Sequence, residues 1–329
     1  LRQVGFNEAV QIALERNTTI KRAENNLDLQ SLTVRSERAD FLPNMNLSTG
    51  ASRNWGLQFD QTVGELRSAS TDVFNYSASS GVNLFNGFAD VASLNAAKAQ
   101  LEAQEFGVER TKQTVVFNVI SNYLSVILAE ENIRIRQEDV QAQQQLLEQI
   151  DEFVRVGTRA ISDLYQQQAT AANAESLLLT AESNFQVAKT RLIQTMQLDP
   201  LSDYDFVAPS PNELPMSIRT YDPSTLLVSA FDSRADLRAQ EATILAAEQG
   251  VRAAKAGYLP SLSLSASLGS GYSSANTRSD FNSQIQDNRS ERVGFNLQIP
   301  LFNRLNVKRG VESSKVQFNN ARLDLENAQ

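Results

Sequence analysis

The sequence contains no cysteine and no histidine among its 329 residues. Their absence excludes Ser-His-Asp and Cys-His catalysis, thiol redox chemistry, disulfide bonds, and zinc or haem sites built on these side chains. Carboxylate pairs remain formally open. However, Glu130-Glu131 and Glu138-Asp139 are successive residues on a predicted helix, where side chains diverge by about 100°. We therefore expect a solvated helix face, no enzymatic activity, no cofactor and no metal.

Basic patches and long apolar runs are also missing. The net charge is −8, and without a basic patch we expect no nucleic-acid partner. No apolar run approaches the roughly 18 residues of a membrane-spanning helix, and the richest stretch, 115–129, is interrupted by asparagine and serine. No signal peptide is present at Leu1. We expect any membrane crossing to use strands, and any export signal to have been removed.

What is present is an internal repeat. An offset of 217 residues aligns Leu42-Pro43 with Leu259-Pro260 and Leu84-Phe85-Asn86 with Leu301-Phe302-Asn303, without any insertion. Apolar periodicity agrees as well as identity. We expect two structural repeats, and we expect the second to be truncated, because the counterpart of residues 113–200 would lie beyond Gln329.

Each repeat is predicted to combine helices with a pair of strands. The first, residues 1–224, is predicted to hold helices at 8–40, 88–156 and 161–198, strands at 43–57 and 72–86, and a proline-rich linker or small belt at 200–224. The second, residues 225–329, is predicted to hold a helix at 225–257, strands at 260–273 and 291–303, and the start of a long helix at 304–329.

The helical segments carry apolar residues every seven positions, which is typical of coiled-coil packing. In the longest helix, one step of four from Val115 to Val119 is a stutter that locally unwinds the coil. This helix would be roughly 100 Å long. The helices at 8–40 and 161–198, stacked end to end, would nearly match its length, which predicts a tall wall of helices. A hairpin at Val156-Gly157-Thr158 would let the helix at 161–198 run back along the long helix.

The strand segments alternate between apolar and polar residues, which is typical of a sheet with one water-facing and one apolar face. Residues 261–268 place serines on one face and Leu262, Leu264, Ala266 and Leu268 on the other. Such strands also occur in soluble sandwiches, but no other segment is apolar enough to cover these faces. Four strands cannot close a barrel. We therefore expect the apolar face to meet lipid and the edges to meet other subunits, with eight strands in a barrel of two subunits or twelve in a barrel of three.

The hairpin sequence from Phe153 to Leu164, the junction Leu84-Phe85-Asn86-Gly87 and the Leu-Pro strand entries resemble those of TolC-like outer-membrane factors, which serve tripartite efflux pumps and type I secretion systems. The resemblance covers essentially the whole chain. It implies a mixed α/β membrane protein, in which long coiled-coil helices form a periplasmic α-barrel and each subunit contributes four strands to a transmembrane β-barrel.

The resemblance also implies partners and a place in the cell. These are a homotrimer, a periplasmic adaptor protein, an inner-membrane transporter and outer-membrane lipid, at the outer membrane with a long periplasmic extension. The function implied is passive passage of small molecules or proteins, and the resemblance does not separate efflux from protein secretion. A coiled-coil rod that bridges envelope layers without a pore is the alternative.

The site residues implied by the resemblance lie at the hairpin. Val156, Gly157, Thr158 and Ser162 would contact the adaptor, and Asp163 would help to hold neighbouring hairpins closed. Each residue also has a plain structural interpretation. Gly157 permits a positive φ in a tight turn, Ser162 could cap the returning helix, and Asp163 favours a helix N-terminal end. Outside the hairpin, Trp55 could join an aromatic girdle or be a simple loop aromatic.

Overall fold

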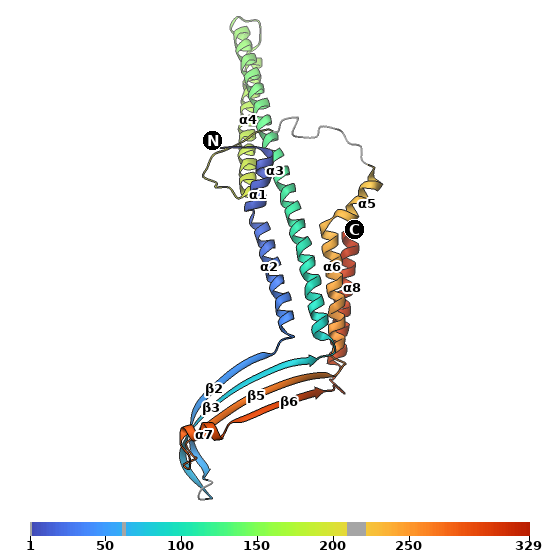
Figure 1. The fold of residues 1–329 in the computed structure, drawn as a ribbon. Helices are drawn as coiled ribbons and strands as arrows, with labels where there is room; N and C mark the ends of the chain where they lie inside the picture. The colour runs from blue at the N-terminus through green and yellow to red at the C-terminus, as the bar shows by residue number, and fades with distance from the viewer. Residues whose placement is uncertain (1, 61–63, 209–221) are drawn as a thin grey trace. The chain divides into compact units, whose positions relative to one another are not determined.

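The computed structural model describes residues 2–60, 64–208 and 222–329, which form a mixed α/β protein (Figure 1). The chain divides into two compact units. The first comprises residues 1–27 and 105–236, and the second comprises residues 28–104 and 237–329. This division cuts across the predicted repeats, whose boundary at 224 remains a prediction.

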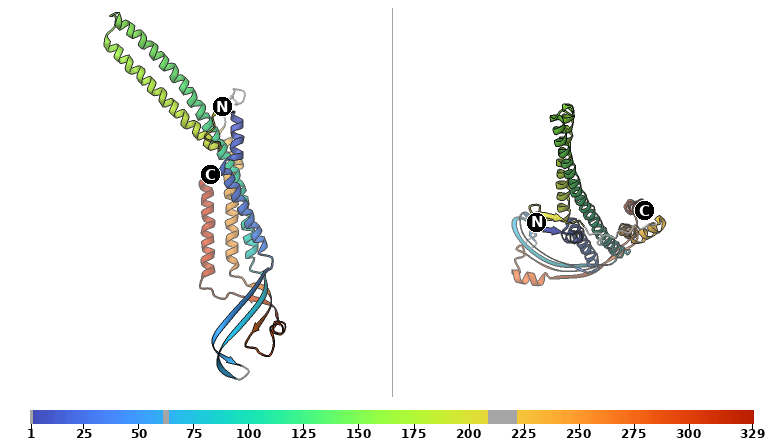
Figure 2. Two further views of the ribbon diagram at one scale, coloured as in Figure 1. Left: turned by 90° about the vertical axis from the view of Figure 1, so that its left-hand side faces the viewer. Right: turned by 90° about the horizontal axis from the view of Figure 1, so that it is seen from above.

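The first unit is built on helices α1 (Phe6–Arg16), α3 (Ala89–Arg155, from Glu105 onward), α4 (Ile161–Met196) and α5 (Pro223–Ser233), and on the start of α2 (Thr18–Ala39). The antiparallel hairpin of α3 and α4 is clear in the left view of Figure 2. Two short strands, β1 (Arg2–Val4) and β4 (Tyr204–Phe206), pair in parallel.

The core of the first unit lies at the heptad stutter of α3. Val115, Val119 and Val126 are 4%, 0% and 1% exposed, and Tyr123 between them is fully buried. The ring of Tyr123 meets Phe6 and Phe206 edge-on, with centroids 5.5 and 5.9 Å away. Its hydroxyl oxygen lies 3.0 Å from the carbonyl of Val4 and 2.6 Å from that of Val207. The core therefore ties α3 to β1 and β4.

Residues 200–224 were predicted to be a linker or a small non-helical belt and not part of the core, but β4 lies in this segment and contributes to the core. Tyr204 and Phe206 of β4 are 6% and 4% exposed and belong to the core cluster. The closely spaced prolines around this strand favoured the prediction of a linker. The strand itself was not predictable, because it pairs over only three residues with a strand that is distant in sequence. Pro209, Pro211 and Pro215, on which the belt prediction depends, lie outside the described residues.

The predicted helix 8–40 is interrupted at Asn17, between α1 and α2. The buried Asn17 side chain accepts a hydrogen bond from the amide of Thr19 and donates one to the carbonyl of Thr195, both at 2.8 Å. The predicted helix 225–257 is likewise interrupted at Arg234, between α5 and α6 (Ala235–Ala256). Hydrogen bonding from Arg234 lowers the pKa of Asp236 below its usual range.

The second unit carries a four-stranded antiparallel sheet in the order β2-β3-β5-β6 (Figure 1). Its strands are β2 (Asn44–Asp60), β3 (Glu65–Phe85), β5 (Ser261–Ser273) and β6 (Ser290–Gln298). The first hairpin is longer than predicted, because residues 58–60 and 65–71 of the predicted polar connection continue the backbone pairing. β6 ends before the predicted residue 303, since Pro300 lacks the amide hydrogen that a ladder needs.

A short helix, α7 (Phe281–Asp287), lies in the predicted polar connection 275–289. The sheet is joined to α2, α3, α6 and α8 (Asn306–Ala328). α5 and α6 repeat the bounds of α1 and α2 at the 217-residue offset, and α8 begins 217 residues after α3. No helix in the described ranges is both long and apolar enough to cross a membrane.

Candidate functional site

The sheet has two chemically different faces, which the strand register defines. Residues that are directly opposed across strands share a face. The apolar face of the sheet consists of Met45, Leu47, Thr49, Ala51, Phe74, Tyr76, Ala78, Val82, Leu262, Leu264, Ala266, Leu268, Tyr272, Val293, Phe295 and Leu297, with a few polar positions between them. The polar face consists of Asn44, Asn46, Ser48, Asn75, Ser77, Ser79, Asn83, Ser263, Ser265, Ser267, Ser290, Arg292, Asn296 and glycines. The predicted alternation is confirmed.

The apolar face is uncovered over most of its area. Met45 and Leu47 of β2 are 83% and 77% exposed, and Val293 and Phe295 of β6 are 73% and 71% exposed. Soluble monomers rarely present contiguous apolar patches larger than a few hundred Å² to water, so such a face indicates a membrane or a protein partner.

Charged side chains on the apolar face occur as ion pairs near the outer ends of the strands, away from the helices. Arg53 of β2 pairs with Asp72 directly across on β3. Arg289, which precedes β6, pairs with Glu291, whose partner across the ladder is Leu268. Pairing lowers the cost of placing charge beside an apolar surrounding. Trp55 lies in β2 beyond Arg53 and is 77% exposed, so it is a strand residue and not a loop aromatic.

Helix α7 covers the outer end of the apolar face. Its Phe281 ring packs on Tyr272 and Phe74, with centroids 5.1 and 5.8 Å away. Gln284, which is 1% exposed, accepts a hydrogen bond from the amide of Ser273 and donates to two carbonyls of the connecting loop. Asp280 caps the helix by accepting from the amide of Ser283. The Asp-x-x-Ser pattern at residues 280–283 could have predicted the start of this helix. The polar composition of the segment favoured a loop instead.

Within the described sheet, β2 and β6 each have only one neighbouring strand. Their outer edges therefore present backbone donors and acceptors that another strand could pair with. Four strands are also too few to close on themselves. Both edges of the described sheet are therefore open for pairing.

The junctions from strand to helix share an unusual backbone. Gly87 and Phe88 precede α3 with φ of 69° and 66°, and Arg304 and Leu305 precede α8 with φ of 54° and 61°. A Cβ at Gly87 would lie only 2.6 Å from the carbonyl oxygen of Ala256. The glycine of the Leu84-Phe85-Asn86-Gly87 motif therefore allows the end of α6 to approach the start of α3.

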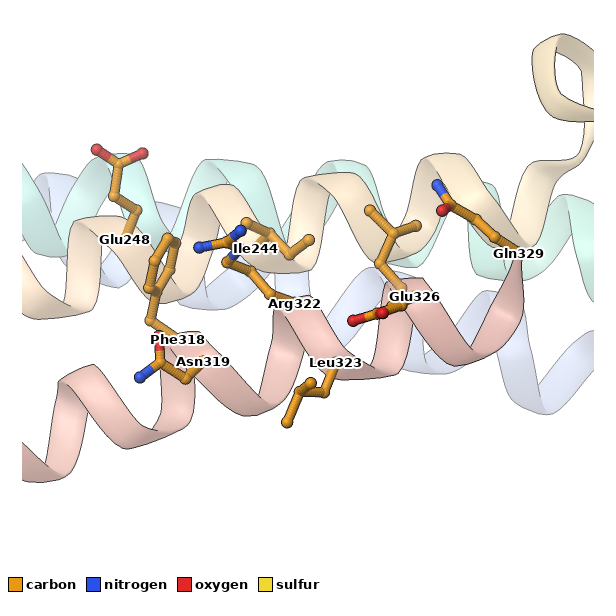
Figure 3. Close-up of a pocket in the computed structure, with 9 residues that line it drawn as sticks. Ile244, Glu248, Phe318, Asn319, Arg322, Leu323, Glu326 and Gln329 are labelled. Carbon is orange, nitrogen blue, oxygen red and sulfur yellow. The ribbon is translucent and has the colours of Figure 1, made fainter.

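A groove runs between α6 and α8 near Gln329, with a volume of about 560 Å³. Figure 3 shows that Phe318 and Arg322 of α8 reach toward α6, where Ile244 lies, while Leu323 points away. The lining mixes apolar side chains with Glu248 and Glu326, as the seam between two helices of a wall does. We assign no ligand to it.

The helical hairpin turns at Gly157, which adopts a φ of 79°. The amide of Gly157 donates to the carbonyl of Val154 at 3.0 Å, and the amide of Thr158 donates to that of Phe153 at 2.9 Å. This is a Schellman motif with glycine at the left-handed position. The side chain of Thr158 donates a further hydrogen bond to Phe153. The prediction that Gly157 permits a positive φ is confirmed.

The N-cap of helix α4 is not Ser162, contrary to the prediction. Its N-cap is Ala160, which has no side-chain oxygen to accept a bond, and Ser162 lies inside the first turn. Ser162 is therefore not the cap. Asp163 is exposed and lies in the first turn, where a negative charge is favourable.

The turn also exposes apolar side chains. Val156 and Ile161 are 65% and 58% exposed, and Tyr165 and Phe153 are 61% and 49% exposed. The turn therefore brings the predicted residues Val156, Gly157, Thr158, Ser162 and Asp163 together with an apolar surface that could contact another protein.

The acidic side chains along α3 belong to a solvated face, as predicted. Arg134 pairs with Glu131 and, at 2.7 Å, with Glu138. Hydrogen bonding from Arg134 lowers the pKa of Glu131, although both side chains remain more than half exposed. This spacing of three and four residues is that of ordinary surface helix pairs.

Gly157→Ala is expected to destabilise the hairpin turn by about 1–2 kcal/mol, since a left-handed conformation costs a Cβ-bearing residue that much. A Cβ there would meet nothing within 4 Å, so the effect is conformational and local. Hydrogen exchange of the amides of residues 157–159 should accelerate, while that of the α3 core around Val119 stays unchanged. Unchanged exchange at the turn would contradict this.

The profile of the family described as "Outer membrane efflux protein" matches residues 9–196 and 226–329. The pyoverdine export outer membrane protein OpmQ of Pseudomonas putida is 28% identical over 273 residues, covering 81% of this chain and 55% of that protein. The outer membrane protein TolC of Vibrio cholerae is 24% identical over 298 residues, covering 90% of this chain and 64% of that protein. The chain spans between 50% and 65% of the length of the curated relatives that it matches.

Solved structures show the same fold. The CmeC outer membrane channel of Campylobacter jejuni superposes with a TM-score of 0.81 at 18% sequence identity, covering 98% of this chain and 67% of that one. At this level of identity the likeness concerns the fold alone.

Proposed function

This chain belongs to the outer membrane efflux protein family, and from that premise we propose that it is a subunit of a trimeric exit duct that conducts solutes passively out of the cell. The family consists of outer-membrane channels and not of enzymes, and its members extend helices into the periplasm. One relative, OpmQ, is named for pyoverdine export.

One observation carries this proposal: the sheet is apolar on one face, polar on the other and unpaired at both edges. Closure with the strands of further copies would bury both edges in backbone hydrogen bonds. Three copies supply twelve strands. The apolar faces then meet lipid, and the serine, asparagine and glycine of the polar faces line a wet passage.

The height of the apolar face supports this orientation. On β5 it extends from Leu262 to Tyr272. Ten steps of about 3.4 Å along a strand tilted by about 40° rise roughly 25 Å, which is the height of the apolar band of outer-membrane barrels. Arg53 and Asp72 lie one row further out. Their paired charges then fall at the border between hydrocarbon and headgroups.

The helices supply the periplasmic part of the proposed duct. Two internal repeats, each with the plan of α1, α2 and a strand pair, would place equivalent helices side by side in the wall. We propose that the turn residues Val156, Gly157, Thr158 and Ser162 contact a periplasmic adaptor, and that an inner-membrane transporter supplies the energy. Asp163 would hold neighbouring hairpins together in a closed entrance.

The alternative is a rod that bridges envelope layers without a pore. A rod needs no polar face across the sheet, so the neutral polar rows of β2, β3 and β5 favour the duct.

Single-channel conductance of the full-length protein in planar bilayers tests the proposal. We expect small discrete steps for the wild type and steps about twofold larger or more for Asp163→Ala, because the closed entrance loses a contact. Asp151→Ala, an exposed acid on the other arm of the hairpin, is the matched control and should leave the steps unchanged. Equal steps for all three proteins would contradict the gating role, and failure to insert would favour the rod.

A further inference from the structure

The polar face of the sheet carries a single ionic side chain, Arg292, between the helix junction and the row of Ser52, Val73 and Ser273. Every other described residue on these rows of the polar face is neutral. We propose that Arg292 places a fixed positive charge in the wall of the passage and makes this level of the duct favour anions. The inference rests on the proposed duct, in which the polar face lines the passage.

The register fixes the position of Arg292. On β6 it is directly opposite Ser267 of β5, and the same row continues through Ser79 of β3 to Asn46 of β2. Its neighbours on the same face along β6 are Ser290 and Gly294. The side chain is exposed, and its register neighbours on this face are small and neutral.

Two described arginines on the apolar side of the sheet, one in β2 and one preceding β6, behave differently. Arg53 and Arg289 are each ion-paired with a carboxylate, Asp72 and Glu291 respectively. Arg292 has no ion-pair partner among the described residues. Charges that face lipid must be neutralised, whereas a charge that faces water need not be. The contrast in pairing agrees with the assignment of the two faces and leaves Arg292 as an uncompensated charge.

Two acidic residues border the same face at its helical end. Asp40 and Asp90 line a pocket of about 400 Å³ with Asn44, Asn83 and Ser263. From the row of Ser267 to that of Ser263, the strand rises roughly 13 Å along its axis. This exceeds the Debye length of about 8 Å at physiological salt. The acids therefore act at a different level, and Arg292 determines the sign of the potential at its own.

In a trimer, three copies of Arg292 would form a ring. Rings of charged side chains are a common basis of ion selectivity in pores. The effect of a ring exposed to water must weaken with salt, since the Debye length falls from about 10 Å at 0.1 M to about 3 Å at 1 M. Selectivity that depends on Arg292 should therefore be largest in dilute salt.

The first test is the reversal potential of the full-length protein under a KCl gradient. We expect Arg292→Gln to shift the cation-to-anion permeability ratio toward K⁺ by roughly two- to fivefold near 0.1 M, and by less near 1 M. Arg289→Gln removes the same charge three residues away on the paired side and should shift the ratio little. A conducting channel whose selectivity is unchanged by Arg292→Gln overturns the inference and leaves the duct intact.

The second test does not depend on conduction. The chain has no cysteine, so single cysteines can be labelled cleanly. In intact cells, we expect Arg292→Cys to react with a charged, membrane-impermeant thiosulfonate, and Val293→Cys on the apolar face to stay unreactive. Labelling of the Val293 variant alone, or of both variants equally, overturns the assignment of Arg292 to the wet wall.

Discussion

Gly87→Ala is expected to lower the free energy of unfolding by about 2–5 kcal/mol. Gly87 adopts a φ of 69°, and a left-handed conformation costs a residue with a Cβ about 1–2 kcal/mol. The new Cβ would also lie 2.6 Å from the carbonyl oxygen of Ala256 and 2.9 Å from Cβ of Leu259. The carbonyl of Ala256 is backbone at the end of α6, and the Cβ of Leu259 is fixed directly to the backbone that follows. Relief therefore requires the junction to open, at about 1–3 kcal/mol for overpacking.

Urea denaturation followed by far-ultraviolet circular dichroism measures this loss. Gly250→Ala is the matched control, because Gly250 lies inside α6 with nothing within 4 Å of a Cβ. Helix propensity predicts that it stabilises by up to about 1 kcal/mol. Gly87→Asn separates the two causes, since asparagine tolerates the left-handed conformation but keeps the collision. We expect it to retain mainly the overpacking loss of about 1–3 kcal/mol, and full recovery would show that the close approach has no cost.

Local chemistry made much of this fold predictable from the sequence. Alternation over residues 261–268 predicts which side chains share a face, because the period of a strand is two and a slip of one residue would reverse every side chain. The Val156-Gly157-Thr158 turn was predictable for a similar reason. Only glycine adopts the left-handed conformation at low cost, so its place between two heptad tracks indicates the turn.

Features that depend on partners far along the chain were not predictable. Asn17 breaks a helix whose apolar spacing runs on from Ala13 to Ile20, because its side chain bonds Thr195, 178 residues away. The three-residue pairing of β1 with β4 joins segments about 200 residues apart. Neither alters local periodicity, which is the signal on which such predictions depend.

The polar composition of the connections between strands led to a wrong prediction of where the strands end. Residues 58–71 were predicted to be a connection, yet β2 and β3 pair as far as Asp60 and Glu65, since backbone pairing tolerates polar side chains. Trp55, Leu57 and Phe59 continued the alternation and were the available signal. Among the candidate site residues, the interpretation of Ser162 as an N-cap was wrong, because the N-cap of α4 is Ala160, two residues earlier.

The second large effect is expected at Tyr123. Its ring is fully buried, and its hydroxyl lies within hydrogen-bonding distance of the carbonyls of Val4 and Val207, to only one of which its single hydrogen can be donated at a time. Tyr123→Phe keeps the ring and removes the donor, so we expect a loss of about 1–3 kcal/mol for leaving a buried acceptor without a partner. Tyr123→Ala also leaves a cavity, and we expect a loss of about 3–5 kcal/mol.

Tyr165 is the matched control for both substitutions, because its side chain is 61% exposed at the hairpin turn. Tyr165→Phe and Tyr165→Ala should each change the free energy of unfolding by less than about 0.5 kcal/mol. Denaturation midpoints give the global effect, and hydrogen exchange of residues 2–4 and 204–206 reports the β1–β4 pair. If Tyr123→Phe left that exchange as slow as in the wild type, the hydroxyl would have no role in holding these strands. If it accelerated there alone, the stutter of α3 would be the point at which a single side chain fastens the strand pair to the helical wall.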